Sequence, residues 1–364
     1  MKALLLVLPI LLSACATVPS KPDAAAVSVY SVAVLGDTHF DAESPDVYHA
    51  RRNEAAKNKY LSEFKRNGEM WRERMPSLVA ASGALAREKP TRFALQLGDM
   101  VQGDCDDPAT HVKMLEDALR TLRAAYPTGL PFLTVMGNHD KRGNGAKEAY
   151  LEFIEPYLSG LLGRKVSYPV FSFPVDGDLW VFCDFETADV DLVSDEIDAH
   201  PDARYVFLVT HGPVTAQDGV RWYWRLGGHY PAARRRLVET LSRRHAIVLS
   251  GHTHTTAFYR HENEFGGFAE MTVNSVWTSP DQATAEPIHD RPEQYGTRSR
   301  NKVDETRRAD YDREHEEFRT GLKEYFFSRA AGHCRLDVSD AGVTLSFYPG
   351  DAREPARTFV LYAK

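Results

Sequence analysis

Five short apolar segments of the chain each end in a small cluster of polar side chains beside a glycine. Apolar segments of this length, rich in β-branched and aliphatic residues, are typical of buried strands. A neighbouring glycine lets the backbone turn sharply and approach other loops closely. Loops at the carboxyl ends of strands in an α/β sheet converge on one crevice, so clusters far apart in the sequence are expected to meet. The clusters are Gly36–His39, Gly98–Asp99, Gly137–Asp140, Thr210–Pro213 and Gly251–His254.

Strand-like and helical segments alternate along most of the chain, which predicts an α/β fold built from layers. Helices are expected at Ala146–Leu158 and Pro231–Arg244, and three strand-like runs close the chain between His333 and Tyr362. The earlier expected strands are Val29–Leu35, Arg92–Leu97, Pro131–Met136, Tyr168–Phe173, Leu179–Phe185, Arg204–Thr210 and Ala246–Ser250.

Two stretches interrupt this alternation inside what we interpret as a single domain, residues 29–364. Residues 46–87 are predicted to be a helical insertion. Residues 279–323 are polar and dense in both charge signs, and are predicted to be a second insertion with one solvated helix around Val303–Lys323. A lid over the site, a surface excursion and an oligomer contact are all compatible with the second insertion.

The first residues are predicted to form a targeting signal rather than part of the fold. A basic start, an apolar run over Ala3–Leu12 and the small residues that follow are typical of a signal peptide, residues 1–14. Leu12-Ser13-Ala14-Cys15 resembles a bacterial lipobox, which implies lipidation of Cys15 and a membrane anchor. Residues 15–28 are then a flexible tether. Ala16 favours the outer membrane if the source is Gram-negative; a plain signal peptide and a periplasmic location are the alternative.

The net charge of the chain argues against one class of binding partner, nucleic acid. Lys and Arg total 44 against 51 for Asp and Glu, so the formal net charge is -7. A phosphate backbone selects basic surfaces, so we expect no nucleic-acid partner.

The five clusters together favour an open metal centre. They offer two carboxylates, one amide and several imidazoles, and no thiolate, which argues against a closed structural zinc site. These are too many donors for one ion that also has room for a substrate. Two divalent ions sharing one carboxylate fit better.

In this respect the sequence resembles the calcineurin-like metallophosphoesterase superfamily, whose five motif blocks occur in order over residues 36–254. The resemblance implies a four-layer α/β/β/α sandwich with two mixed sheets. It also implies that a hydroxide between two ions attacks phosphorus, that His139 protonates the leaving oxygen or stabilises its charge, and that Asp140 orients the His139 ring. The implied ligands are Asp37, His39 and His254 for one ion, Asn138, His211 and His252 for the other, and Asp99 between them.

One position departs from a branch of this superfamily. Purple acid phosphatases carry a tyrosine ligand to ferric iron three residues after the bridging aspartate, where this chain has Gln102. We therefore expect no ferric pair, while Mn, Zn and Fe(II) stay open.

Some neighbouring residues have two interpretations each. Asp140 suits a turn role as well as an orienting one. Lys141 and Arg142 follow the third cluster and either contact the substrate phosphate or are solvated, as basic residues after turns usually are. The aromatic run between Arg221 and Arg225 either forms a wall of the site or packs its loop onto the domain. Whether Cys105 and Cys334 form a disulfide is open.

The sequence thus predicts a dinuclear metal-dependent phosphoric ester hydrolase of the bacterial cell envelope. Its substrate is expected to be a small-molecule phosphodiester or phosphomonoester. The Asn-His-Asp ending looks more like small-molecule phosphodiesterases than protein phosphatases. The alternative is a surface lipoprotein that uses the metals to stabilise a binding or assembly module without turnover.

Overall fold

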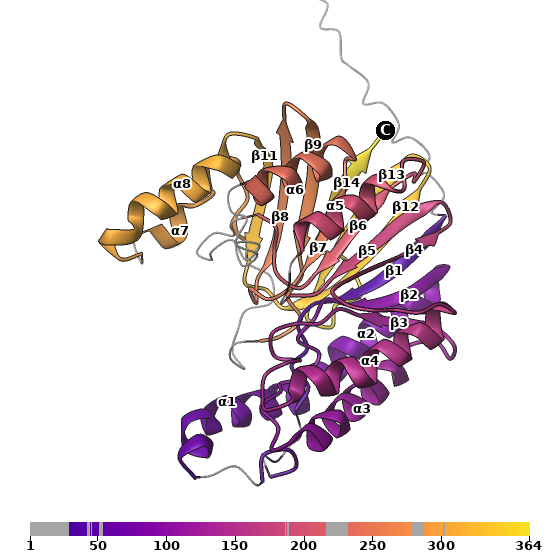
Figure 1. Ribbon diagram of the computed structural model, residues 1–364, viewed down its shortest axis with the longest axis vertical. Helices are drawn as coiled ribbons and strands as arrows, with labels where there is room; N and C mark the ends of the chain where they lie inside the picture. The colour runs from indigo at the N-terminus through magenta and orange to yellow at the C-terminus, as the bar shows by residue number, and fades with distance from the viewer. Residues whose placement is uncertain are drawn as a thin grey trace, which may run out of the picture.

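The structure is a computed structural model that describes residues 29–41, 44, 46–50, 54–185, 187, 189–215, 232–277, 287–300 and 303–364. Within these residues two mixed β-sheets pack against each other and helices cover their outer faces (Figure 1). This is the four-layer α/β/β/α sandwich that the sequence predicts. Cys15 and the expected signal peptide and tether lie outside the described residues.

The first sheet has six strands, and its parallel half carries the first three clusters. β1, β2 and β3 run parallel, and β12, β13 and β14 extend the sheet in antiparallel fashion from β1. In spatial order the strands are β14 (Arg357–Ala363), β13 (Gly342–Pro349), β12 (Gly332–Ser339), β1 (Tyr30–Leu35), β2 (Thr91–Gln96) and β3 (Phe132–Thr134).

The second sheet has eight strands, and its parallel centre carries the other two clusters. β5, β6, β7 and β9 are parallel neighbours, while β4, β8, β11 and β10 pair in antiparallel fashion. In spatial order the strands are β10 (Pro287–His289), β11 (Leu322–Ser328), β8 (Thr256–Asn263), β9 (Gly266–Thr272), β7 (Ile247–Ser250), β6 (Val206–Thr210), β5 (Asp178–Cys183) and β4 (Val170–Val175).

The central strands of the second sheet are apolar on both faces because each face is covered. Trp180 and Phe182 point into the core between the sheets, whereas Leu179 and Val181 lie in a second core beneath helices. The helices over this outer face are α5 (Val190–Asp198) and α6 (Ala232–Arg243), and those over the six-stranded sheet are α2 (Met75–Glu88), α3 (Pro108–Ala124) and α4 (Ala146–Leu162).

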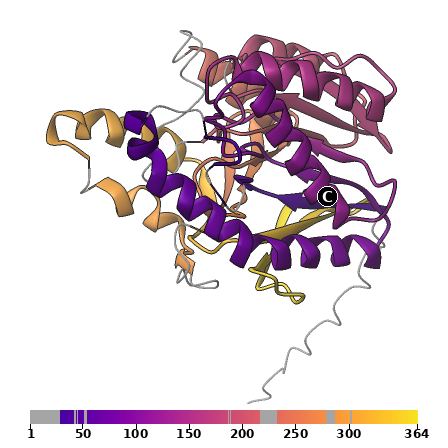
Figure 2. The same ribbon diagram turned by 90° about the horizontal axis from the view of Figure 1, so that it is seen from below.

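The predicted helical insertion, residues 46–87, divides into two parts with different positions. α1 (Glu54–Glu73) and α2 are separated only by Arg74, and in Figure 2 the indigo α1 extends beyond the sheets. α2 instead buries Leu78 and Val79 in the core shared with β1 and β12. α2 is therefore a covering helix of the sandwich, and the excursion itself is confined to α1 and the segment before it.

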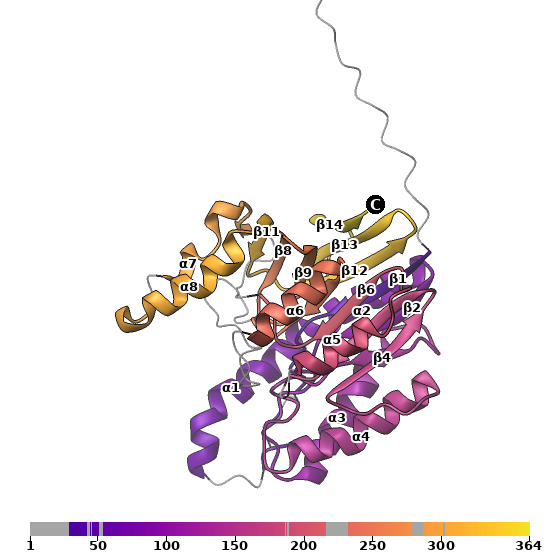
Figure 3. The same cartoon turned by 45° about the horizontal axis from the view of Figure 1, so that its top comes forward.

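The charged stretch 279–323 also contributes to the sheet. It contains β10, the short α7 (Thr297–Arg300), α8 (Arg308–Arg319) and the 3-10 turns η2 (Pro292–Gln294) and η3 (Glu305–Arg307). The helix expected around Val303–Lys323 ends earlier, because β11 begins at Leu322 and pairs with β8. The buried Tyr295 ring lies 5.9 Å from the Tyr259 ring of β8, which fixes the base of the excursion to the sheet. Figure 3 shows α1 and the α7–α8 pair on the same side of the sandwich.

Cys105, Cys183 and Cys334 are buried thiols, so Cys105 and Cys334 form no disulfide. Among the described residues, no helix has the length and apolar character that a membrane span requires.

Candidate metal centre

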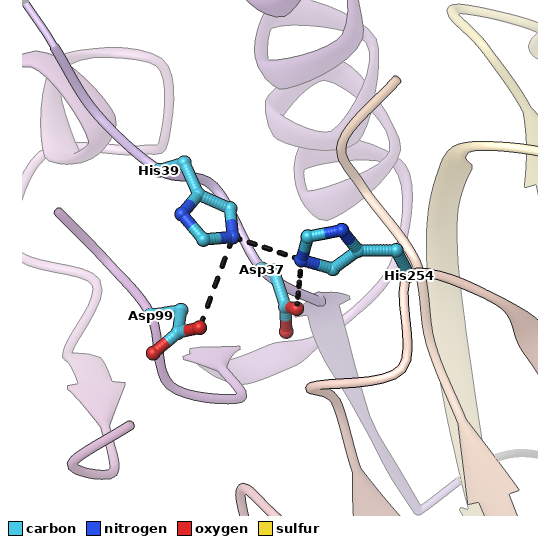
Figure 4. A group of neighbouring side chains, drawn as sticks. All are labelled: Asp37, His39, Asp99 and His254. Atoms are coloured by element: carbon cyan, nitrogen blue, oxygen red, sulfur yellow. Dashed lines mark hydrogen bonds and ion pairs between the residues drawn. The ribbon is translucent and has the colours of Figure 1, made fainter. Parts of the chain in front are cut away.

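Four side chains from three of the clusters meet at one point (Figure 4). Nε2 of His39 lies 2.9 Å from Nε2 of His254, and Nε2 of His254 lies 3.1 Å from Oδ2 of Asp37. Oδ2 of Asp99 is 3.8 Å from Nε2 of His39 and completes the group. Asp37 and His39 follow β1, Asp99 follows β2 and His254 follows β7, so both sheets contribute.

A second group forms directly beside the first and shares Asp99 with it. Nε2 of His211 lies 3.2 Å from Oδ2 of Asp99 and 3.2 Å from Oδ1 of Asn138. Nδ1 of His252 lies 3.2 Å from the same His211 nitrogen. The structure thus brings together all seven residues that the sequence predicts as ligands, in the two groups that the resemblance implies.

The loops that carry these side chains have an unusual backbone. His39, Asp99, His252 and His254 all have positive φ, a conformation that costs free energy for residues other than glycine. Gly98 is required beside Asp99, since a Cβ atom there would lie 2.5 Å from Nδ1 of His211. Strain of this kind persists where the surrounding structure fixes it, and it is often found at functional sites.

The donor atoms are aimed by hydrogen bonds on their far sides. Nδ1 of His211 donates to the Leu97 carbonyl oxygen at 2.7 Å, which turns Nε2 toward the centre. The carboxylates use one oxygen each in the same way: the His252 amide donates to Oδ1 of Asp37 at 2.8 Å, and the His139 amide donates to Oδ1 of Asp99 at 2.7 Å.

The electrostatics of the centre are those of a cation site. Burial lowers the pKa of His211, but the carboxylates of Asp99 and Asp37 outweigh it and raise this pKa to about 9. Burial and the charge on His211 lower the pKa of His252 to about 3. A proton on His211 therefore supplies positive charge where the carboxylates need it.

The residues present fit a pair of divalent ions. In the first group, Nε2 of His254 lies near 3 Å from both Nε2 of His39 and Oδ2 of Asp37, and one hydrogen cannot satisfy all three atoms as acceptors. In the second group, two imidazole nitrogens also face each other, at 3.2 Å. The donors are imidazole, carboxylate and amide, which suit Mn, Zn or Fe rather than a thiolate-specific site.

His139 lies next to the first group. Its ring makes an edge contact with the His39 ring at a centroid distance of 4.4 Å, and its Nδ1 donates to the Gln102 carbonyl oxygen at 2.8 Å. Burial lowers the pKa of His139, Asp99 opposes this shift, and Arg142 adds to it.

The expected role of Asp140 as orienter of the His139 ring is wrong. Its carboxylate is fully buried and accepts hydrogen bonds from the Val101 amide at 3.1 Å and the Gly137 amide at 2.8 Å. Asp140 therefore joins the loops after β2 and β3, which is the turn role that the sequence also allows. The Gln102 carbonyl oxygen holds the His139 ring instead.

Two features of the site were not predicted. Phe185, just past β5, lies 4.8 Å from the His252 ring and 5.4 Å from the His211 ring, and forms an aromatic wall beside the second group. Its place at the end of a parallel strand is the signal that would have indicated it. Gln102 binds Asn67 and Glu63 of α1 through its side chain, and no local pattern indicates this. The aromatic run Arg221–Arg225 lies outside the described residues.

The fold and the site define a metal-dependent phosphoesterase, and sequence comparison agrees. The profile of the calcineurin-like phosphoesterase family matches residues 30–256, so the chain belongs to this family. No functionally curated protein sequence matches the chain significantly.

Solved structures with the same fold include phosphatases. A purple acid phosphatase from yellow lupin (Lupinus luteus) gives a TM-score of 0.53 at 10% identity, over 91% of this chain and 53% of that protein. A dimetal phosphatase from Danio rerio gives 0.52 at 12% identity, over 92% and 100%. PhoD gives 0.51 at 11% identity, over 92% and 69%. This chain therefore spans about half of the lupin enzyme and all of the Danio rerio enzyme.

Proposed function

We propose that the chain hydrolyses small-molecule phosphate esters, diesters or monoesters, with two divalent ions of Mn, Zn or Fe. The observation that carries this proposal is the presence of two donor groups that share Asp99, with His139 beside them. The proposed ligands are Asp37, His39 and His254 for one ion, Asn138, His211 and His252 for the other, and Asp99 for both.

Two ions bound in these groups supply Lewis acidity, which activates water and neutralises charge on phosphoryl oxygens. The chain's own contribution is mainly orientation. Because a carbonyl oxygen only accepts, the bond to Gln102 places the hydrogen of neutral His139 on Nδ1. Nε2, which accepts a hydrogen bond from Nη1 of Arg142, is then the atom that would take up a proton from water and pass it to the leaving oxygen.

The test measures bound metal and turnover together. The purified chain is loaded with Mn, Zn or Fe(II), its metal content is determined, and rates on p-nitrophenyl phosphate and bis-p-nitrophenyl phosphate are compared. We expect about two ions per chain. Faster diester hydrolysis would direct the search to diesters, and faster monoester hydrolysis to nucleotides and sugar phosphates.

His139→Ala should retain the metals and lose about 100-fold or more of the rate. His200→Ala is the matched control, because His200 is exposed on the surface after α5. A chain that binds no metal contradicts the proposed site. Two bound ions without turnover on either ester would favour the non-catalytic binding module.

We also propose that the protein is lipid-anchored through Cys15 in the bacterial cell envelope, on the strength of the signal sequence. Metabolic labelling with palmitate should mark the wild-type chain and not Cys15→Ser. Equal labelling of both chains would contradict a lipid on this residue.

A further inference from the structure

Arg142 is held beside the metal centre by three side chains. Its Nη1 donates to Nε2 of His139 at 3.1 Å, and its Nη2 lies 3.0 Å from Oε1 of Glu63 on α1. Its Nε pairs with Asp104. The side chain is 29% exposed, so it is mostly packed against the protein and still reachable from solvent.

The contact with His139 puts a positive charge at the edge of the first donor group. The His139 ring is in contact with the His39 ring, so the guanidinium is separated from the first group by a single side chain. The Nδ1 hydrogen of His139 is used by Gln102, and Arg142 only donates. Nε2 of His139 therefore accepts from Nη1 of Arg142 at 3.1 Å, which places the guanidinium within one hydrogen bond of the ring beside the first group.

We propose that Arg142 is a phosphate-binding residue: its guanidinium binds an oxygen of the substrate phosphoryl group beside His139. A phosphoryl oxygen only accepts, so it can bind a guanidinium hydrogen of Arg142 directly, whereas Nε2 of His139 can contact it only when that nitrogen is protonated. Arginine suits this task because its planar, permanently charged fork makes strong bonds to phosphate oxygens. This inference rests on the proposed hydrolysis of phosphate esters.

Glu63 and Asp104 act as positioning residues for Arg142. A long side chain loses rotamer freedom when it is fixed, and the two carboxylates have already fixed this one before a ligand arrives. Glu63 also accepts a bond from the Gln102 side chain at 2.9 Å, and the Gln102 backbone holds His139. Glu63 lies on α1, so this helix, which extends beyond the sheets, contributes to the placement of Arg142.

The same contacts would suit a clamp that only fixes α1 to the domain, and the experiment separates the two roles. Arg142→Ala, Arg142→Lys and Glu63→Gln are prepared in the full chain, with Arg92→Ala as the control. Arg92 forms a surface ion pair with Asp176 at 2.7 Å, so the Arg92→Ala substitution removes a comparable ion pair away from the site. Each metal-loaded protein is measured for KM and kcat on the better aryl phosphate ester, for inorganic phosphate affinity by calorimetry, and for Tm.

We expect Arg142→Ala to raise KM and the Kd of inorganic phosphate by about 10- to 100-fold with unchanged metal content, the range for loss of a bond to a charged group. Arg142→Lys should lose less, because it keeps the charge, and Glu63→Gln should lose a few-fold. KM and phosphate Kd within twofold of wild type in all three variants would overturn the inference, even if Tm falls. If Arg142→Ala does not fold, the other two variants decide. Phosphate calorimetry tests Arg142 even if the wild type hydrolyses neither ester, an outcome that would count against the proposed function instead.

Discussion

Glu270 on β9 is a fully buried carboxylate that holds the turn after His211, and its burial makes stability depend on pH. Oε1 accepts from the Val214 amide at 2.8 Å, and Oε2 accepts from the Thr215 amide at 2.9 Å and the Thr215 hydroxyl at 2.5 Å. Burial raises the pKa of Glu270 to about 7, and the bonds from Thr215 and Val214 only partly oppose it.

The direction of this pKa shift determines how the stability of the fold changes with pH. The folded protein binds the Glu270 proton more tightly than the unfolded chain does, so the favourable contribution is complete below the ordinary pKa near 4.5. It is lost as the pH rises through the folded pKa of about 7. One pKa unit is worth about 1.4 kcal/mol, so the full loss is ~3 kcal/mol, of which about 2 kcal/mol falls between pH 5 and pH 8.

Glu270→Gln removes the titrating group and nearly preserves its shape. The amide places a donor opposite backbone N–H groups, so the variant should be less stable at low pH. The informative quantity is therefore the pH slope and not the level. Urea denaturation in EDTA at pH 5, 6, 7 and 8 gives the free energy of unfolding of both proteins without bound metal.

The difference in unfolding free energy between wild type and Glu270→Gln should shift by about 2 kcal/mol against the wild type from pH 5 to pH 8. Glu264→Gln, at the exposed turn between β8 and β9, should show no comparable shift. A constant difference across this pH range would refute the reasoning, because it would mean that Glu270 ionises as readily in the folded protein as in the unfolded chain.

Three further predictions concern the metal centre. Gly98→Ala should abolish metal binding, since its Cβ would lie 2.5 Å from Nδ1 of His211. Gly129→Ala is the control: with a similar φ of 84° and open space around it, this variant should lose only ~1 kcal/mol of stability and keep the metals. Asp99→Asn should weaken binding of both ions by more than about 100-fold, as measured by metal analysis after dialysis, and loss of one ion alone would contradict a shared ligand. Metal binding at pH 7.5 should release a proton from His211, because its pKa is about 9 without ions. Calorimetry in two buffers of different ionisation enthalpy measures this proton release, and identical binding heats in the two buffers would contradict the prediction.

The ligands could be predicted because each follows a strand directly. Asp37, Asp99 and His252 stand one or a few residues past an apolar run, and the end of a parallel strand fixes their place in space whatever the rest of the chain does. The sandwich could be predicted for the same reason, together with the family resemblance. The local sequence pattern left two roles open for Asp140, orienting the His139 ring or stabilising the turn. The outcome depended on which backbone amides lie within hydrogen-bonding reach of its carboxylate in the folded chain.

Contacts across long sequence separations could not be predicted. Glu63 and Arg142 are 79 positions apart, and Glu270 and Val214 are 56 apart, so no local spacing connects them. The hairpin β8–β9 was not among the expected strands. Polar residues such as Arg260 and Glu262 interrupt its apolar pattern, which only half follows the alternation of a strand with one exposed face.

The direction of β1 has a consequence for access to the metal centre. The strand enters the fold at Tyr30 and ends at Leu35 after six residues and about 20 Å, and Asp37 follows two residues later. The segment that precedes β1 therefore joins the domain at the end opposite the metal centre. With Cys15 in a membrane, as we propose, the tether would join the domain at the end far from the metal centre, so the anchor itself would not cover that centre.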